Sequence, residues 1–123
     1  MDFYYCHKCG ALYIKANEIG EATPVCCGEE TEKLVANSTD AAQEKHVPVP
    51  TREGNKVSVV VGSVPHPMEE VHWIDLIAVV QGSKVQSVAL KPGDEPKAEF
   101  TVDDGPVTVY AHCNKHGLWV AEA

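Results

Sequence analysis

Short runs of β-branched and aromatic residues, many alternating with polar ones, fill the chain from His46 onward. Stretches rich in glycine, proline, asparagine and aspartate separate these runs and have the composition of turns. Runs of this kind at regular spacing predict six or seven short antiparallel strands, and no segment shows a long helical stripe. The clearest predicted strands are 57–61, 73–80, 85–90, 98–102, 107–111 and 118–120. The pattern therefore indicates an antiparallel β-sandwich or barrel.

The first 35 residues have a different texture, with four cysteines and only brief apolar stretches at 3–5, 11–14 and 33–35. These stretches predict short strands that are too small to form a core. A piece below roughly 40 residues usually needs a metal or disulfides to fold. We therefore predict a small domain over 1–36, a polar linker over 37–45 and a β-domain over 46–123.

Composition narrows the class of protein further. The 123 residues are 44% hydrophobic and 23% charged, as expected of a globular chain, and the formal net charge is −8. Nucleic acids and anionic membranes select basic surfaces, so neither is an expected partner. No apolar run approaches the roughly 20 residues of a membrane helix, and the first residues do not resemble a signal peptide. We expect a cytoplasmic protein, in which cysteines serve metals or catalysis more often than disulfides.

Four of the five cysteines form one candidate metal group near the N-terminus. Cys6 and Cys9 form a CxxC knuckle, and Cys26 and Cys27 follow as an adjacent pair. Four thiolates predict tetrahedral zinc or iron. Neighbouring residues of an extended strand point to opposite faces, so the adjacent pair needs a bent backbone and predicts a distorted tetrahedron. A structural zinc is the alternative, although adjacent cysteines favour iron. His7 is expected to be exposed and not to be a ligand.

The fifth cysteine belongs to a second candidate group, together with four histidines. Two histidines lie in a predicted loop before strand 73–80, two further members lie in the turn before strand 118–120, and one lies at the start of the β-domain. Loops of a sandwich cluster at its two ends, so these segments can converge on one ion. Taken singly, each residue has an ordinary explanation, as His112 does, but their joint occurrence favours a metal. The group is His46, His66, His72, Cys113 and His116.

The composition of this second group narrows the choice of metal. Four imidazoles and one thiolate differ from the closed tetrahedron of structural zinc and from a blue-copper set. A five-ligand nitrogen and sulfur set with a vacant sixth position suits ferrous iron. An open position on a redox metal is where small-molecule chemistry takes place.

The motifs CHKCG and CC near the N-terminus, with EKHVP, HPMEEVHWI and CNKHGLW further along, resemble those of the desulfoferrodoxins. These are two-iron superoxide reductases, and the resemblance covers nearly the whole chain. It implies an all-β protein in which a small rubredoxin- or desulforedoxin-like domain precedes an immunoglobulin-like antiparallel β-sandwich. The implied cofactors are an iron in a tetracysteine centre and a catalytic iron, cycling between ferrous and ferric states, in a centre of four histidines and one cysteine.

The same resemblance implies a role for each group. Cys6, Cys9, Cys26 and Cys27 would hold the iron that is not the site of catalysis. At the second iron the four imidazoles of His46, His66, His72 and His116 would be equatorial and the Cys113 thiolate axial. Superoxide would bind opposite the sulfur, gain one electron and two protons, and leave as hydrogen peroxide, without dismutation to oxygen.

Further residues gain a role only through the resemblance. Lys45 would lie near the open position and help to draw in superoxide, and Glu44 would occupy that position in the ferric state. By composition alone, both are ordinary solvated charges. Asn114 and Lys115 lie in the turn after Cys113, where backbone amides can hydrogen-bond the Cys113 sulfur and tune the reduction potential of the iron. A role for the Lys115 side chain stays open.

The resemblance also implies partners and a setting. It implies a rubredoxin-type electron donor, a homodimer and a part in superoxide defence in an anaerobe or microaerophile. Two alternatives stay open at this point. One is a non-catalytic iron electron-transfer protein with a closed second site, and the other is a zinc-stabilised binding module.

Overall fold

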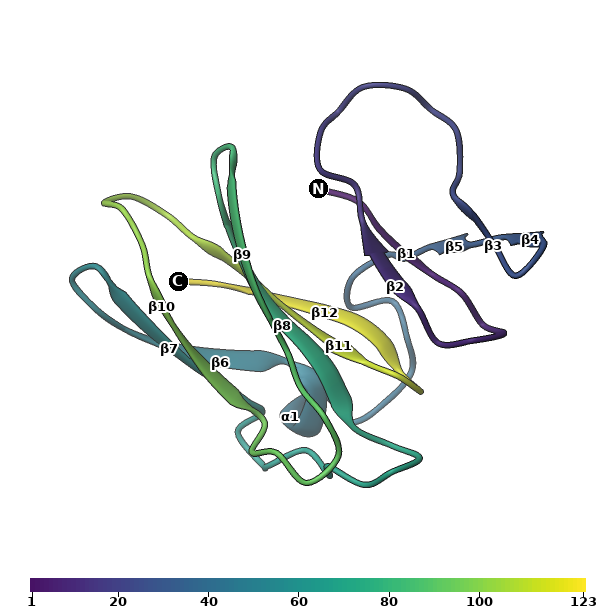
Figure 1. The fold of residues 1–123 in the computed structure, drawn as a ribbon. Coiled ribbons are helices and arrows are strands. Elements are labelled where there is room, and N and C mark those ends of the chain that lie inside the picture. Colours follow the sequence, from purple (N-terminus) through teal and green to yellow (C-terminus); the bar gives the residue numbers. More distant parts are fainter. The chain divides into compact units, whose positions relative to one another are not determined.

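The structure, a computed structural model, describes residues 1–123 and divides into two compact units (Figure 1). Unit 1 comprises Met1–Val35 and unit 2 comprises Ala36–Ala123, so residues 37–45 belong to unit 2. Both units are built from antiparallel strands, and the only helix is one short turn. The all-β class that the sequence predicts is therefore confirmed. No helix has the length and apolar character that crossing a membrane requires.

Unit 1 is a small three-stranded sheet with an additional hairpin. The sheet has the order β2 (Leu12–Ile14), β1 (Phe3–Tyr5), β5 (Glu32–Lys33), and the hairpin joins β3 (Val25–Cys26) to β4 (Glu29–Glu30). Its buried apolar residues are only Phe3, Tyr4 and Cys6. So small a core cannot offset the entropy of ordering about 35 residues without a further source of stability.

Unit 2 consists of two antiparallel sheets. One has the order β10 (Lys97–Thr101), β7 (Lys56–Val61), β6 (Pro48–Glu53), and the other has the order β12 (Gly117–Glu122), β11 (Thr108–Cys113), β8 (Ile74–Gln81), β9 (Lys84–Ala89). The six strands that were clearest in the sequence are all present. The seventh, β6, was missed because Pro48 and Pro50 lack amide hydrogens and weaken the strand signal. β6 is an edge strand, the position in a sheet that tolerates proline.

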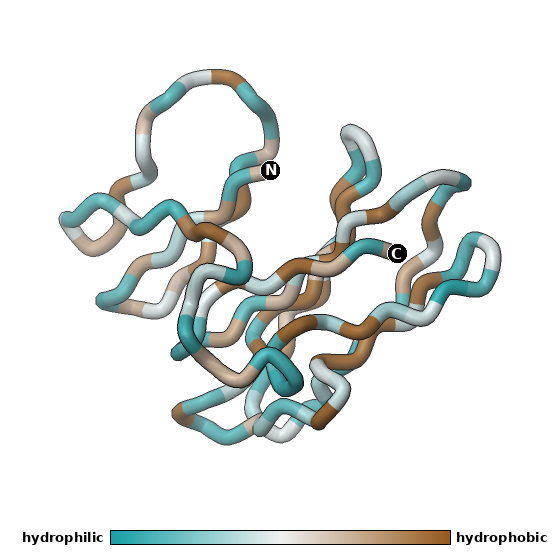
Figure 2. The backbone as a smooth tube through the Cα atoms, turned by 180° about the vertical axis from the view of Figure 1, so that it is seen from behind, coloured by the Kyte–Doolittle hydropathy of each residue, from teal (hydrophilic) through white to brown (hydrophobic).

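The core of unit 2 lies between these two sheets. Val57, Val59 and Val61 alternate along β7 and are buried, and Ile77 of β8 and Val109 of β11 are buried with them in the same cluster. Each such side chain contributes about 1.5–3 kcal/mol when fully buried. Figure 2 shows apolar stretches along the strands and polar residues at the hairpin tips. The sandwich is thus held by its own hydrophobic contacts.

The helix α1 (Gln43–His46) is fastened to the segment that follows β7. The carbonyl oxygen of Glu44 accepts hydrogen bonds from the Val64 amide, at 2.9 Å, and from the Ser63 hydroxyl, at 3.2 Å. Gly62 is buried directly beneath: a Cβ atom there would lie 2.6 Å from the Glu44 carbonyl oxygen. Only glycine permits this approach, and the approach sets the place of the helix.

We expect Gly62→Ala to displace α1, because the added methyl group meets backbone atoms that cannot rotate away. The expected cost is about 1–3 kcal/mol of unfolding free energy. Hydrogen exchange should show faster exchange of the Val64 and Val47 amides, whose acceptors are the Glu44 and Gln43 carbonyls.

A suitable control is Gly82→Ala, at a hairpin tip where the backbone has a φ of +59° and a Cβ would meet nothing within 4 Å. Backbone strain alone costs roughly 1–2 kcal/mol there. The control should leave exchange around α1 unchanged. Equal protection of the Val64 amide in both variants would contradict the role assigned to Gly62.

Candidate metal centres

The four N-terminal cysteines converge at one end of unit 1. The sulfur atoms of Cys6, Cys9, Cys26 and Cys27 all lie within 4.8 Å of one another. The CxxC knuckle follows β1 as a tight turn in which the Gly10 amide donates to the Cys6 carbonyl at 2.8 Å. The second pair comes from the β3–β4 hairpin. The sequence prediction that these four side chains form one group is consistent with this placement.

The bent backbone expected at the adjacent cysteines is present at Cys27, whose φ is +54°. This left-handed conformation turns its sulfur toward the others, and the Cys26 and Cys27 sulfurs are 3.9 Å apart. For a residue other than glycine the conformation costs roughly 1–2 kcal/mol. Nothing in the small core of unit 1 compensates for this cost, whereas bonds from both sulfurs to one cation would.

The electrostatics of the four thiols also indicate a cation. An amide hydrogen bond from Cys9 to the Cys6 sulfur is the main cause that lowers the pKa of Cys6 to about 6. The pKa of Cys27 is raised to about 12, first by its hydrogen bond with the Cys9 sulfur and then by the other thiols. Without a cation, the group therefore cannot ionise as a whole. A divalent ion removes this conflict, because coordinated thiols are deprotonated.

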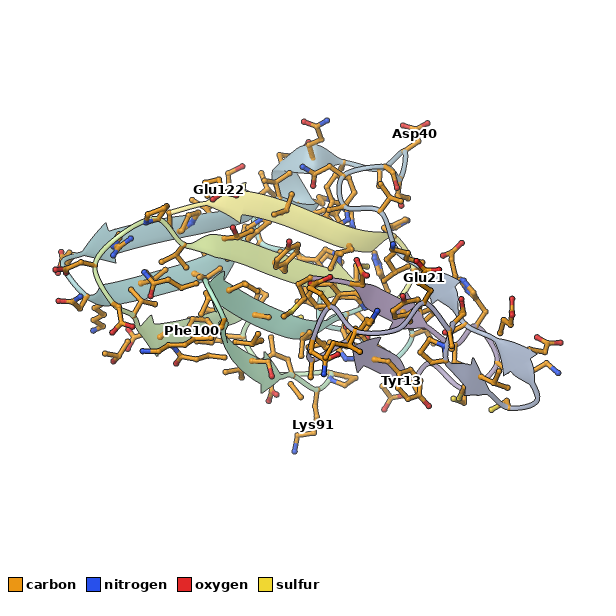
Figure 3. The ribbon with its side chains drawn as sticks, turned by 90° about the horizontal axis from the view of Figure 1, so that it is seen from above. Tyr13, Glu21, Asp40, Lys91, Phe100 and Glu122 are labelled. Atoms are coloured by element: carbon orange, nitrogen blue, oxygen red, sulfur yellow. The ribbon has the colours of Figure 1, made fainter.

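Tyr13 is a neighbour of this group that sequence reasoning missed (Figure 3). Its hydroxyl is hydrogen-bonded to Cys26, and this bond, together with the negative charge of that sulfur, raises the pKa of Tyr13 to about 12. Tyr13 lies on β2 opposite Tyr4, and its spacing in the sequence gives no signal of this contact.

The second group gathers at one end of unit 2 from three separate segments. α1 supplies one histidine, the loop between β7 and β8 supplies two, and the end of β11 with the turn after it supplies the last two residues. All five donor atoms lie within 4.8 Å of one another, so the structure brings together the residues that the sequence singled out. They are His46, His66, His72, Cys113 and His116.

Two imidazoles of this group face each other in a way that requires a positive charge between them. The Nδ1 atoms of His46 and His66 donate to the carbonyl oxygens of Ala42, at 2.7 Å, and Pro67, at 2.6 Å. Burial lowers the pKa of His66 to about 4 and lowers that of His46, so both rings are neutral. Each Nε2 atom then carries a lone pair, and the two are 3.1 Å apart. Two acceptors at this distance repel unless a cation binds both.

The ring nitrogens of the other two imidazoles, those of His72 and His116, also belong to this group of donors. His72 Nε2 is buried and has no hydrogen-bond partner, although a buried polar atom normally has one. The ring of His116 presents Nδ1, which lies 3.0 Å from His46 Nε2 and 3.8 Å from the Cys113 sulfur. The chemistry of the five donors therefore fits a metal ion, with nitrogen and sulfur ligands.

Trp119 supports two members of the group and was not singled out by the sequence. It is buried, its ring stacks on His46 with the centroids 5.1 Å apart, and its indole nitrogen donates to the His116 carbonyl at 3.0 Å. Its place three residues after His116 was the available signal. A rigid aromatic plane against one ligand fixes the orientation of that ring.

The surroundings of Cys113 correct one expectation. Burial raises the pKa of this thiol, and amide hydrogen bonds from Lys115 and His116 oppose that rise. The sequence pointed to the amides of Asn114 and Lys115. The Asn114 amide instead donates to the Trp73 carbonyl at 3.2 Å, so His116 takes its place. Cys113 also lies at a register shift, where it pairs with Ile74 while the preceding residue pairs with Leu76.

The remaining candidates lie outside both groups of donors. Glu44 and Lys45 are exposed on α1, directly before His46. Burial is the main cause that lowers the pKa of His46. The charge of Lys45 lowers this pKa further, and the charge of Glu44 raises it. His112 is buried against Asp75, with Nδ1 and Oδ1 2.7 Å apart. His7 is exposed, as the sequence predicts, and lies 3.3 Å from a Glu32 carboxylate oxygen.

Together, the fold and the two groups define a class of protein. An all-β chain with a tetracysteine group in a small unit, and four histidines with one cysteine in a sandwich, is a protein with two iron-binding centres. Residues 38–122 match the desulfoferrodoxin family model. Since this match spans more than half of the chain, the chain belongs to the desulfoferrodoxin family.

Individual relatives agree with this assignment. A desulfoferrodoxin homolog of Archaeoglobus fulgidus is 50% identical over 119 residues, which cover 97% of this chain and 94% of the relative. A desulfoferrodoxin of Nitratidesulfovibrio vulgaris is 43% identical over 122 residues, covering 99% and 96% of the two chains. The crystal structure of the superoxide reductase from Treponema pallidum is 28% identical, with a TM-score of 0.76 and coverage of 97% and 98%.

We expect His72→Ala to remove binding at the second group while the first group still fills. The substitution deletes the imidazole whose buried nitrogen has no other partner. Anaerobic titration of the metal-free protein with ferrous iron, followed by metal analysis after gel filtration, should show the stoichiometry fall by half. His7→Ala removes a histidine outside both groups and should bind as the unaltered protein does. Full stoichiometry in His72→Ala would contradict the assignment of His72.

Proposed function

We propose that this protein is a superoxide reductase. In the proposed reaction one superoxide anion gains one electron and two protons and leaves as hydrogen peroxide, and no oxygen is formed. The observation that carries the proposal is the group of four imidazoles and one thiol in unit 2, three of them buried and two partly buried. The solved structure from Treponema pallidum, which is similar over nearly the whole chain, bears the name superoxide reductase.

We assign the catalytic iron to this second group. Its ligands are His46, His66, His72, Cys113 and His116. A ferrous ion held there would supply the single electron, which zinc cannot do because it has no redox chemistry. Five donors are one fewer than a six-coordinate ion accepts, so such an ion would keep one position for the substrate.

The charges of the residues favour an anionic substrate. Burial lowers the pKa of His46, His66 and His72, so these imidazoles are neutral at pH 7. The Cys113 thiolate contributes the only negative charge among the five donors. A divalent ion in this group therefore leaves a net positive charge, which attracts superoxide although the whole chain carries −8.

Lys45 and Glu44 are proposed to act beside the substrate position. The exposed Lys45 ammonium adds positive charge directly before His46 and helps to draw in the anion. The Glu44 carboxylate is proposed to cover the same position once the electron has been transferred. The short helix that carries both side chains is fixed by Gly62 and by the hydrogen bonds to the Glu44 carbonyl.

The first group is proposed to hold a second iron that takes no direct part in the reaction. Its ligands are Cys6, Cys9, Cys26 and Cys27, and four sulfur donors leave no position for a substrate. A rubredoxin-type donor is proposed to return the electron after each turnover. We further propose that the protein is a cytoplasmic homodimer that protects an anaerobe or microaerophile against superoxide.

The stoichiometry of the reaction tests the proposed function. The fully iron-loaded, anaerobically reduced protein is mixed with superoxide, and both peroxide and oxidised iron are measured. We expect one peroxide for each superoxide consumed, with matching oxidation of iron. One peroxide for every two superoxide anions would indicate dismutation. No reaction would favour a protein that only transfers electrons.

Two cysteine variants separate the proposed roles of the two groups. Cys113→Ser removes the only thiolate of the second group, and we expect peroxide formation to be abolished. Cys27→Ser is the matched substitution in the first group, and most of the activity should remain. Both activities are measured per iron bound in the second group. Retained turnover in Cys113→Ser would overturn the assignment of the catalytic group.

A further inference from the structure

His72 lies near the end of a loop, where the backbone has little support from within the loop itself. The loop joins β7 to β8, and the only backbone pairing at His72 is an isolated bridge to Glu69, with hydrogen bonds of 2.9 and 3.1 Å. Val71, next to it, is 65% exposed. A bridge within the loop does not fix the position of the loop against the other donor residues. That position must come from a contact with another element.

The ring of His72 also lacks the anchor that two other rings have. Nδ1 of His46 and Nδ1 of His66 each donate to a backbone carbonyl oxygen, and these bonds orient the two imidazoles. The structure shows no such bond for the ring of His72, and its buried Nε2 has no partner. The orientation of this ring therefore depends on the backbone on either side of it.

The side chain of Asn114 holds the backbone on both sides of His72. Its Oδ1 atom accepts a hydrogen bond from the Trp73 amide at 2.9 Å, and its Nδ2 atom donates to the Val71 carbonyl oxygen at 3.0 Å. The Asn114 amide adds a third bond, to the Trp73 carbonyl oxygen, at 3.2 Å. Asn114 itself directly follows Cys113, in the turn that also carries His116. One residue thus ties the loop of one donor to the turn of two others.

We propose that Asn114 is a positioning residue, whose side-chain amide clamps the His72 loop onto the Cys113–His116 turn and thereby sets the place of His72 in the second metal centre. This inference rests on the proposed function, because it concerns the same metal. A side-chain amide suits this role, because it can accept a hydrogen bond from one backbone amide and donate one to a backbone carbonyl oxygen at the same time. Loss of such an outer contact typically lowers metal affinity 10–100-fold.

If Asn114 only stabilised the fold, its loss would affect the second metal centre no more than the loss of a similar residue far from the centre. Gln81 is such a residue and provides the matched control. Gln81 lies at the other end of β8 and makes the same kind of clamp with its side-chain amide. It accepts from the Asp103 amide at 2.8 Å and donates to the Asp103 carbonyl oxygen at 2.7 Å. Gln81→Ala removes a comparable pair of hydrogen bonds without touching a donor residue.

The test compares the unaltered full chain with Asn114→Ala and Gln81→Ala, each loaded with the Mössbauer isotope of iron. The tetrathiolate iron and the nitrogen-rich iron give separate quadrupole doublets, so the first centre is an internal reference. Each protein is then challenged anaerobically with increasing concentrations of a ferrous chelator. We expect Asn114→Ala to lose the second iron at a chelator concentration about 10–100-fold lower, with its doublet altered. The doublet of the tetrathiolate iron should not change in any variant.

Asn114→Asp is a second variant for the case that the alanine protein does not fold. Aspartate keeps the acceptor for the Trp73 amide but places a carboxylate oxygen against the Val71 carbonyl. Its negative charge alone would raise the affinity for a cation, so weaker retention of the second iron would support the clamp. Retention equal to or above that of the unaltered chain would count against the clamp.

The inference is overturned if Asn114→Ala retains the second iron as Gln81→Ala does and shows an unchanged doublet. This result is distinct from failure of the proposed function. An unaltered chain that binds no nitrogen-coordinated iron would overturn the proposed function and the inference together. A normal second iron in the unaltered chain with an unchanged Asn114→Ala would overturn the inference alone.

Discussion

Repulsion between buried lone pairs is the constraint on which the second centre depends. Nε2 of His46 and Nε2 of His66 face each other at 3.1 Å, and both rings are kept neutral by burial. Their other nitrogens are committed to backbone carbonyl oxygens, so neither ring can turn to relieve the contact. A metal ion converts this repulsion into two bonds. The same contacts that make the metal-free group unfavourable are therefore those that orient its ligands in advance.

The sandwich can hold such an arrangement because its stability comes from elsewhere. Valine and isoleucine side chains from both sheets fill the core of unit 2. The donor residues lie at one end of it, on α1, a loop, the end of β11 and the turn after it. Gly62 fixes the helix, Trp119 fixes the His46 ring, and the pairing of β11 with β8 fixes the backbone of Cys113. Loops on a rigid scaffold are where binding groups are usually placed. The hydrophobic core thus supports a site that would be unstable by itself.

The sequence allowed much of this to be predicted, because hydrophobic alternation and ligand chemistry are local signals. Six strands of unit 2, both groups of donors and the bend at Cys27 followed from them. The strand β6 did not, because its prolines hide a pairing that only an edge position permits. The bond between Tyr13 and Cys26 and the placement of Asn114 also could not be predicted. Each depends on which atoms two distant segments bring together, and no pattern within one segment records that.

The two centres differ in what the metal must do, and this difference supports placing the proposed reaction at one of them. Unit 1 buries only Phe3, Tyr4 and Cys6 and includes a strained Cys27, so its fold needs all four sulfur bonds. An ion that is needed for stability in this way must be fully coordinated and has no place for a substrate. Unit 2 is stabilised by its own core and can leave its ion incompletely coordinated without loss of the fold. A vacant position can therefore be kept in unit 2, and the proposed reaction belongs there.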